Sequence, residues 1–134
     1  MKPSEHELKL LGDYILLPIA ITVVNTNRIE METSTATLRK LYSDTAMIMM
    51  NRMREELSVV RQKLDERRIV VIDTEEFHEG EYVHYPYVLR GHHGMFAINK
   101  EVIRTSVIAH IHRYVAEVVH IVALNQANPT SVLT

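Results

Sequence analysis

The chain has 134 residues, of which 46% are hydrophobic, and its 15 cationic and 17 anionic side chains give a formal charge of -2. This length lets one domain, residues 1–134, bury about two thirds of its unfolded surface. The lack of cysteine excludes disulfides and thiolate metal sites, and no secretory signal pattern is found, so we expect a cytoplasmic protein. The near-neutral charge gives no overall field that would collect nucleic acid or anionic lipid.

The first predicted element is a helix over residues about 5–31. Ser4 and Glu7 have the spacing of a capping box, in which each side chain accepts a hydrogen bond from the other residue's backbone N–H. An apolar run follows over residues 14–24. As a helix this run spans only about 16 Å, about half the thickness of a bilayer core, so we expect a buried helix and no membrane span. Pro18 lacks a backbone N–H and should kink the helix.

A second helix is predicted over residues about 35–67, with hydroxyl caps from Thr33, Ser34 and Thr35 at its start. Apolar residues recur along it at spacings of three and four, which indicates one continuous amphipathic stripe. The stripe comprises Leu38, Leu41, Tyr42, Thr45, Ile48, Met49, Met53, Leu57, Val60 and Leu64. A helix of this length measures about 45 to 50 Å, more than a compact monomer of this size needs. The surplus length predicts a homodimer.

A β-hairpin is predicted over residues about 69–90, which are rich in β-branched and aromatic residues. We expect Glu79 and Gly80 to form a two-residue turn. The resulting cross-strand pairs are Phe77 with Tyr82, Glu75 with His84, Ile72 with Tyr87 and Val70 with Leu89. Side chains alternate along a strand, so one face should pack on the helices. That face carries Val70, Ile72, Thr74, Val83, Tyr85, Tyr87 and Leu89. The opposite face, with Glu75 and His84, would be open to water or to a partner.

The last predicted elements are a second turn at residues 91–94 and a helix over residues about 100–124, with Asn99 as its N-cap. Residues 125–134 are predicted to form a frayed tail. The predicted fold class is therefore α+β and mostly α, with two long antiparallel helices, a β-hairpin and a third long helix.

Eight histidines make a metal site worth testing. The candidate ligands are His92, His93, Glu117 and His120. Glu117 and His120 have the Glu-x-x-His spacing of di-iron carboxylate bundles, but those bundles use the motif twice. His92 and His93 are neighbours, whose side chains should point apart. We therefore expect no bound metal and no other cofactor, and a histidine-based metal or pH-responsive module stays open as an alternative function.

Nucleic-acid binding is the other alternative, because helices followed by a hairpin resemble the winged-helix plan of transcriptional regulators. The second helix also carries cationic side chains at Arg52, Arg54, Arg61, Lys63, Arg67 and Arg68. The predicted hairpin tip, however, carries five carboxylates within residues 73–81, and these would repel phosphate. We therefore expect no nucleic-acid partner.

The apolar run from Tyr14 to Val24, followed by a long helix, resembles a small family of uncharacterised cytoplasmic proteins from Gram-positive, spore-forming bacteria. The resemblance covers about the first third of the chain and is hydrophobic in character. It implies an accessory protein with no known chemistry.

The sequence contains no Gly-x-Ser-x-Gly and no His-Glu-x-x-His motif, and we expect no catalytic residues. The leading hypothesis is a non-enzymatic protein–protein interaction or regulatory protein that acts as a homo-oligomer. Its contacts would use the second helix and the outer face of the hairpin. The residues assigned to this surface are Met47, Met50, Met53, Glu75 and His84.

Overall fold

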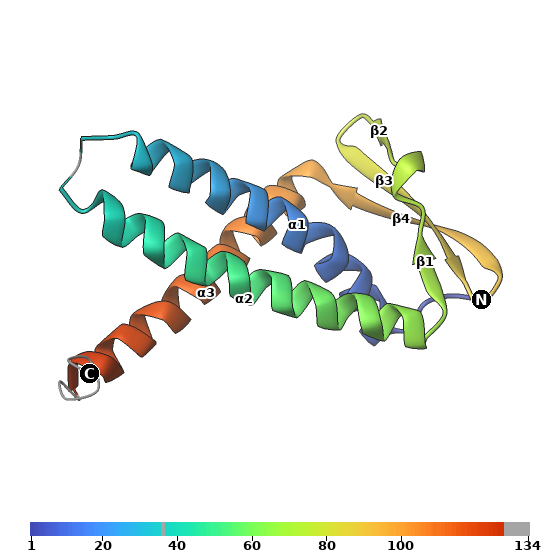
Figure 1. The fold of residues 1–134 in the computed structure, drawn as a ribbon. Coiled ribbons are helices and arrows are strands. Elements are labelled where there is room, and N and C mark those ends of the chain that lie inside the picture. The colour runs from blue at the N-terminus through green and yellow to red at the C-terminus, as the bar shows by residue number, and fades with distance from the viewer. Residues whose placement is uncertain (36, 128–134) are drawn as a thin grey trace.

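Two antiparallel helices form the long axis of the molecule, a small sheet lies at one end of them, and a third helix crosses them (Figure 1). The computed structural model describes residues 1–35 and 37–127. The elements are α1 (Glu5–Glu32), α2 (Arg39–Glu66), β1 (Ile69–Val71), the short 3-10 helix η1 (Asp73–Glu75), β2 (Phe77–Glu79), β3 (Tyr82–Leu89), β4 (His92–Asn99) and α3 (Lys100–Ala127). The fold is α+β and mostly helical, as predicted.

The start of α1 has the predicted capping box. The Glu7 backbone N–H donates to the Ser4 hydroxyl at 3.2 Å, and the Ser4 backbone N–H donates to the Glu7 carboxylate at 2.9 Å. Pro18 lies inside α1 without ending it. Among the described residues, no helix combines the length and the hydropathy that a membrane crossing requires.

The loop between α1 and α2 differs from the prediction, because α2 begins at Arg39 and not near residue 35. The Thr33 hydroxyl donates to the Glu30 carbonyl at 3.0 Å, and the Ser34 hydroxyl donates to the Met31 carbonyl at 2.8 Å. These hydroxyls therefore satisfy the last carbonyls of α1. Leu38, at the N-cap position of α2, makes no side-chain cap.

The sheet has one central strand, β3, and is larger than the predicted hairpin. β1 and β2 pair with one edge of β3, and β4 pairs along the other edge, all antiparallel. The prediction of a turn at residues 91–94 is wrong, because only the Arg90–Gly91 step turns, with both residues at positive φ. Gly94 lies within β4 opposite Tyr87, where any Cβ atom would overlap the Tyr87 ring. That aromatic ring, and not a turn, requires glycine here.

The predicted hairpin register is also wrong. His84 lies opposite Phe77 and not opposite Glu75, and Leu89 lies opposite Ile69 and not opposite Val70. The turn uses Gly80 and Glu81 because Gly80 adopts the positive φ. Because Ile69 lies opposite Leu89, Ile69 is buried, whereas Val70 is 59% exposed. The inward face predicted for β3 is confirmed at Val83, Tyr87 and Leu89, which are buried.

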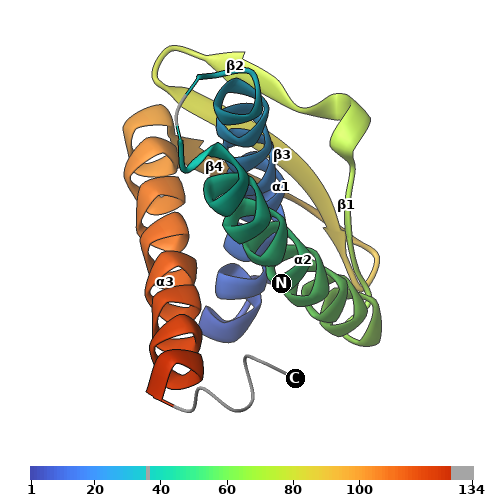
Figure 2. The same ribbon diagram turned by 60° about the vertical axis from the view of Figure 1, so that its left-hand side comes forward.

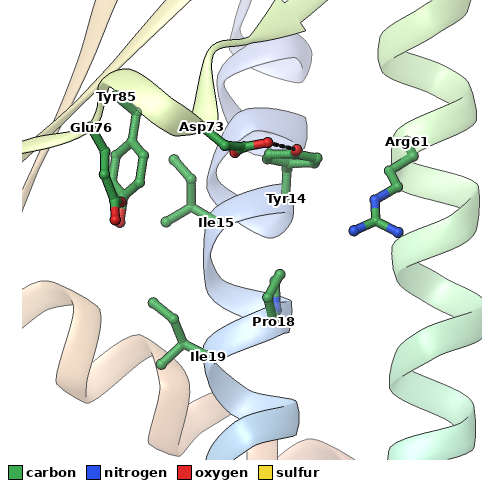
Figure 3. Close-up of a pocket in the computed structure, with 8 residues that line it drawn as sticks. All are labelled: Tyr14, Ile15, Pro18, Ile19, Arg61, Asp73, Glu76 and Tyr85. Atoms are coloured by element: carbon green, nitrogen blue, oxygen red, sulfur yellow. Dashed lines mark hydrogen bonds between the residues drawn. The ribbon is translucent and has the colours of Figure 1, made fainter.

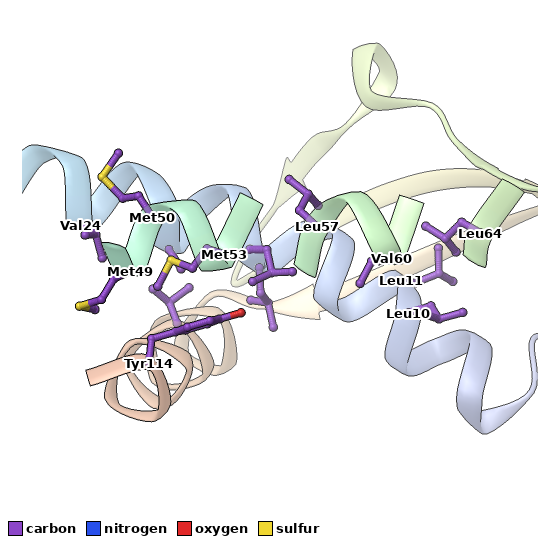
Figure 4. Packing of buried hydrophobic residues seen from close by; sticks show 14 of the residues in the cluster. Leu10, Leu11, Val24, Met49, Met50, Met53, Leu57, Val60, Leu64 and Tyr114 are labelled. Atoms are coloured by element: carbon purple, nitrogen blue, oxygen red, sulfur yellow. The ribbon is translucent and has the colours of Figure 1, made fainter. Parts of the chain in front are cut away.

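Helix α3 begins after Asn99, whose side chain accepts a hydrogen bond from the Glu101 backbone N–H at 2.8 Å, as the predicted N-cap should. It ends at Ala127, three residues beyond the predicted end, and the rest of the predicted tail lies outside the described residues. Figure 2 shows α3 standing beside the α1–α2 pair. The hydrophobic core lies between the three helices and the inner face of the sheet (Figure 4). Its largest fully buried side chains are Leu11, Leu17, Met50, Met53 and Leu89.

Candidate functional site

The edge of the sheet is interrupted where it passes α1. The Ile72 N–H donates to the Pro86 carbonyl at 2.9 Å, but Pro86 has no N–H to return the bond. The ladder between β1 and β3 ends at this pair, and residues 73–75 form η1 before β2 resumes the pairing. η1 therefore stands apart from β3, and it is tied to α1 by a hydrogen bond from the Tyr14 phenol to the Asp73 carboxylate at 2.7 Å.

A pocket of about 330 Å³ lies under η1, between α1, α2 and β3 (Figure 3). We call it the Tyr14 pocket. The residues that line it are Tyr14, Ile15, Pro18, Ile19, Arg61, Asp73, Glu76 and Tyr85. A smaller hollow of about 220 Å³ shares Tyr14 and Arg61 with it and extends towards β1. Sequence reasoning missed this site, because the residues come from four separate segments and none of them belongs to a motif.

Both phenols in the Tyr14 pocket stay protonated at neutral pH. Burial, and then the hydrogen bond to Asp73, raises the pKa of Tyr14 to about 12. Burial, and then the neighbouring Glu76 carboxylate, raises the pKa of Tyr85 to about 12. The Arg61 guanidinium lies 5.9 Å from the centre of the Tyr14 ring, which is a cation–π distance. The pocket thus offers neutral hydrogen-bond donors, carboxylates and one cation.

A buried carboxylate joins the helices to the sheet beside this region. Glu7 is 3% exposed, and its carboxylate lies 2.9 Å from the Arg90 guanidinium and 3.8 Å from the Arg67 guanidinium. Arg90 also donates to the Arg67 carbonyl at 2.9 Å. The hydrogen bonds from Arg90 and then from the Ser4 backbone lower the pKa of Glu7 to about 2. This carboxylate is therefore ionised at neutral pH, and we interpret it as structural.

A second buried polar group lies where α3 crosses α1. His110 Nε2 is 3.5 Å from an Asp13 carboxylate oxygen, and Asp13 also pairs with Lys9 at 3.1 Å. His110 Nε2 and the Tyr114 hydroxyl are buried without a hydrogen-bond partner among the described residues. Burial, and then the nearby Arg113, lowers the pKa of His110. Its imidazole is therefore neutral at neutral pH.

The structure does not gather the predicted metal candidates. His92 and His93 are exposed neighbours at the start of β4, whereas Glu117 and His120 are exposed in the later part of α3. Figure 1 places these two segments at opposite ends of the molecule. Glu117 instead lies 3.9 Å from Arg52 of α2. Within the described part of the chain, no group of three or more metal-ligating side chains is found.

The predicted interaction surface is only partly on the surface. Met47 is 39% exposed, but Met50 and Met53 are 2% and 0% exposed, so both belong to the core and cannot contact a partner. They face α1 and α3, which cover that side of α2 (Figure 4). Glu75 is exposed in η1 and does not pair with His84. His84 instead stacks on Phe77, with ring centres 4.6 Å apart.

A different part of the predicted stripe on α2 is exposed. From Met49 onwards the stripe is buried, whereas four of its residues before Met49 are exposed. We call these four residues the distal stripe: Leu38, Leu41, Tyr42 and Ile48, which are 53%, 60%, 54% and 47% exposed. Periodicity identified these residues as apolar and regular, but it could not show which part of the stripe the rest of the chain covers.

Three of the six basic side chains assigned to the second helix contact groups of their own chain. Arg52 lies near Glu117, Arg61 lies over the Tyr14 ring, and Arg67 lies 3.8 Å from Glu7. From α3, Arg113 reaches the α2 residue Glu56 at 2.9 Å. These contacts join the helices to one another, whereas Arg54, Lys63 and Arg68 form no ion pair with the described carboxylates.

Comparison with known proteins supports one relationship. Neither a curated protein nor a solved structure matches the chain. The family described as YhjD protein matches residues 2–119, which include all three helices except the end of α3, together with the whole sheet. Because this match covers most of the sequence, the chain belongs to the YhjD family.

Proposed function

We propose that the protein is a non-enzymatic interaction or regulatory protein and that it acts as a homo-oligomer through the distal stripe. One observation carries the proposal: the apolar stripe of α2 includes residues that the rest of the chain does not cover. Leu41 and Ile48, seven residues apart on this stripe, are about half exposed. Exposed apolar side chains gathered on one element mark association surfaces more often than isolated ones do.

A second copy of the chain is the partner that fits this surface best. The stripe has a helical spacing of three, four and seven residues, so two copies related by a two-fold axis would present the same ridges and grooves to each other. The stripe also lies at the end of the α1–α2 pair that is remote from the sheet (Figure 1). The residues Glu75, Met47 and His84 stay predictions as further contacts.

Light scattering coupled to size exclusion at micromolar concentration tests the proposal. We expect a mass of about 31 kDa, twice the 15.5 kDa of one chain. The double variant Leu41→Ser/Ile48→Ser should give a monomer, because it places two hydroxyls in the centre of the interface. The matched control is Val102→Ser/Ile108→Ser on α3, where the two side chains are 49% and 47% exposed.

Two results would contradict the proposal: a wild-type mass near 15.5 kDa, or a double variant on α2 that keeps the wild-type mass. Circular dichroism of both variants should match wild type, because all four side chains are exposed.

We also propose that the protein works in the cytoplasm, in an accessory role with no chemistry of its own. The absence of cysteine supports a reducing compartment. The five carboxylates within residues 73–81, which would repel phosphate, support a protein partner over nucleic acid. Undetectable affinity for random duplex at low salt would agree with this, and salt-dependent binding would contradict it.

A further inference from the structure

Opposite charges lie on opposite sides of the Tyr14 pocket. Asp73 and Glu76 lie on the side of η1, and Arg61 projects from α2 on the other side (Figure 3). The floor between them is apolar and belongs to α1. A ligand in this pocket would therefore meet acceptors at one end, a cation at the other and hydrocarbon in between.

The charged groups have unused binding capacity. The Tyr14 phenol donates to one Asp73 oxygen at 2.7 Å, and within the described residues the second oxygen accepts no hydrogen bond. Arg61 forms no ion pair with any described carboxylate, and its contact with Tyr14 leaves most of its five N–H donors available. Glu76 lies beside the Tyr85 phenol, which stays a neutral donor.

The balance of charges selects among ligand classes. A simple anion attracted to Arg61 would also meet two carboxylates, and a simple cation attracted to those carboxylates would meet Arg61. A molecule with both an ammonium and a carboxylate group satisfies both ends at once. The volume of about 330 Å³ is at the small end of the range of ligand pockets, which suits a molecule the size of one amino acid.

We propose that the Tyr14 pocket binds a free amino acid with an apolar side chain. Its ammonium group lies against Asp73 and Glu76, its carboxylate is bound by Arg61, and its side chain rests on Ile15 and Pro18 of α1. This site is remote from the distal stripe, so amino-acid binding does not require dimer formation, and the variant Leu41→Ser/Ile48→Ser should still bind.

The test is a chemical-shift titration of the ¹⁵N-labelled full chain with leucine, valine, methionine and phenylalanine, one at a time, up to millimolar concentration. At least one of them should shift the amides of residues 72–77 and of Arg61 saturably. Its amino-alcohol analogue, which lacks the carboxylate, and its carboxylic-acid analogue, which lacks the ammonium group, should each bind at least about tenfold more weakly.

Two matched pairs of variants locate the site. Arg61→Gln and Glu76→Gln should each weaken binding about tenfold or more, because each removes one charged contact with the ligand. Arg54→Gln on α2 and Glu75→Gln in η1 remove the same charges from exposed positions that do not line the pocket, and should leave binding unchanged. The resonance dispersion of each variant shows that it is folded.

The proposal is overturned if none of the four amino acids shifts these amides. It is also overturned if an analogue with one charge binds as tightly as the amino acid, or if Arg61→Gln and Glu76→Gln bind as wild type does.

Discussion

The two ends of the α1–α2 pair differ in what covers them. At the sheet end, Glu7 of α1 is enclosed by arginines from α2 and from the β3–β4 turn, and Leu89 of β3 closes the core at 1% exposure. At the loop end the two helices have mainly each other, joined by a hydrogen bond from the Ser43 hydroxyl to the Glu32 carboxylate at 2.6 Å, while Leu41 is 60% exposed. In a pair of helices, each helix buries one apolar stripe against the other. A second apolar stripe on the same helix is buried only where a further element packs on it.

The largest expected difference between the two ends concerns packing. Leu89→Ala should lower the free energy of unfolding by about 3 kcal/mol, because it leaves a cavity in a closed part of the core. Ile29→Ala, near the loop end where the side chain is 47% exposed, should change it by less than about 0.5 kcal/mol. Urea unfolding measures both values. Equal losses would show that the loop end is packed as tightly as the sheet end.

The next effect concerns the buried carboxylate. Glu7→Gln should cost about 2 kcal/mol at neutral pH, because it removes the buried carboxylate with which Arg90 and Arg67 pair. The folded-state pKa of about 2 lies below the ordinary value of 4.5, so the stabilisation is present above pH 4.5 and is lost as the pH falls towards 2.

Urea unfolding of wild type and Glu7→Gln across this pH range should therefore converge in acid. At the loop end, Glu30→Gln provides the matched control, because the Glu30 side chain is exposed and pairs with no described residue, so its loss should matter much less. A gap between wild type and Glu7→Gln that persists unchanged into acid would refute the electrostatic explanation.

Two glycines allow a further comparison at the sheet end of the molecule, one in β4 and one in α1. Gly94→Ala should destabilise by about 1 to 2 kcal/mol, because the new Cβ overlaps the buried Tyr87 ring. Gly12→Ala, inside α1 with nothing near the position of a Cβ, should stabilise by about 0.5 to 1 kcal/mol. Thermal unfolding should move the two midpoints in opposite directions, and a shift in the same direction would contradict this account of Gly94.

The smallest effect lies midway between the ends, at His110. Its folded-state pKa is below the ordinary 6.5, so the unfolded chain takes up the proton first as the pH falls. Its contribution to stability is therefore complete above pH 6.5 and declines below it. His110→Gln should flatten this part of the stability–pH curve, whereas His112→Gln, exposed on the same helix, should not. Identical curves for the two variants would rule out His110 as the cause.

Local patterns predicted the helices well, and the sheet poorly. Ser4 and Asn99 cap their helices as expected, because a cap depends on neighbours within a few residues. The register between β2 and β3 depends on which residue of the turn adopts a positive φ, and Gly80 does so at the first and not the second position. The register of β1 is set separately, because η1 interrupts the chain between β1 and β2, and it places Ile69 in place of Val70 opposite Leu89. This shift of one residue moves Val70 from the core to the surface.

The remaining errors come from contacts that span the chain. Residues 91–94, most of which form the start of β4, were predicted as a turn because glycine is common in turns, and only the Tyr87 ring on the neighbouring strand shows why Gly94 lies within a strand. The Tyr14 pocket depends on Pro86 ending the ladder and on Asp73 reaching a helix 59 residues earlier in the sequence. No periodicity carries that information.

The break in the sheet edge at η1 also affects the tendency of this protein to aggregate. A foreign strand that tried to align along β1 or β2 would find only three consecutive residues before the backbone turns away. Natural proteins use such short, interrupted edges to prevent templated aggregation. That side of the sheet is therefore guarded against amyloid-like growth, and β4, with eight continuous residues, is the side from which any such growth would have to begin.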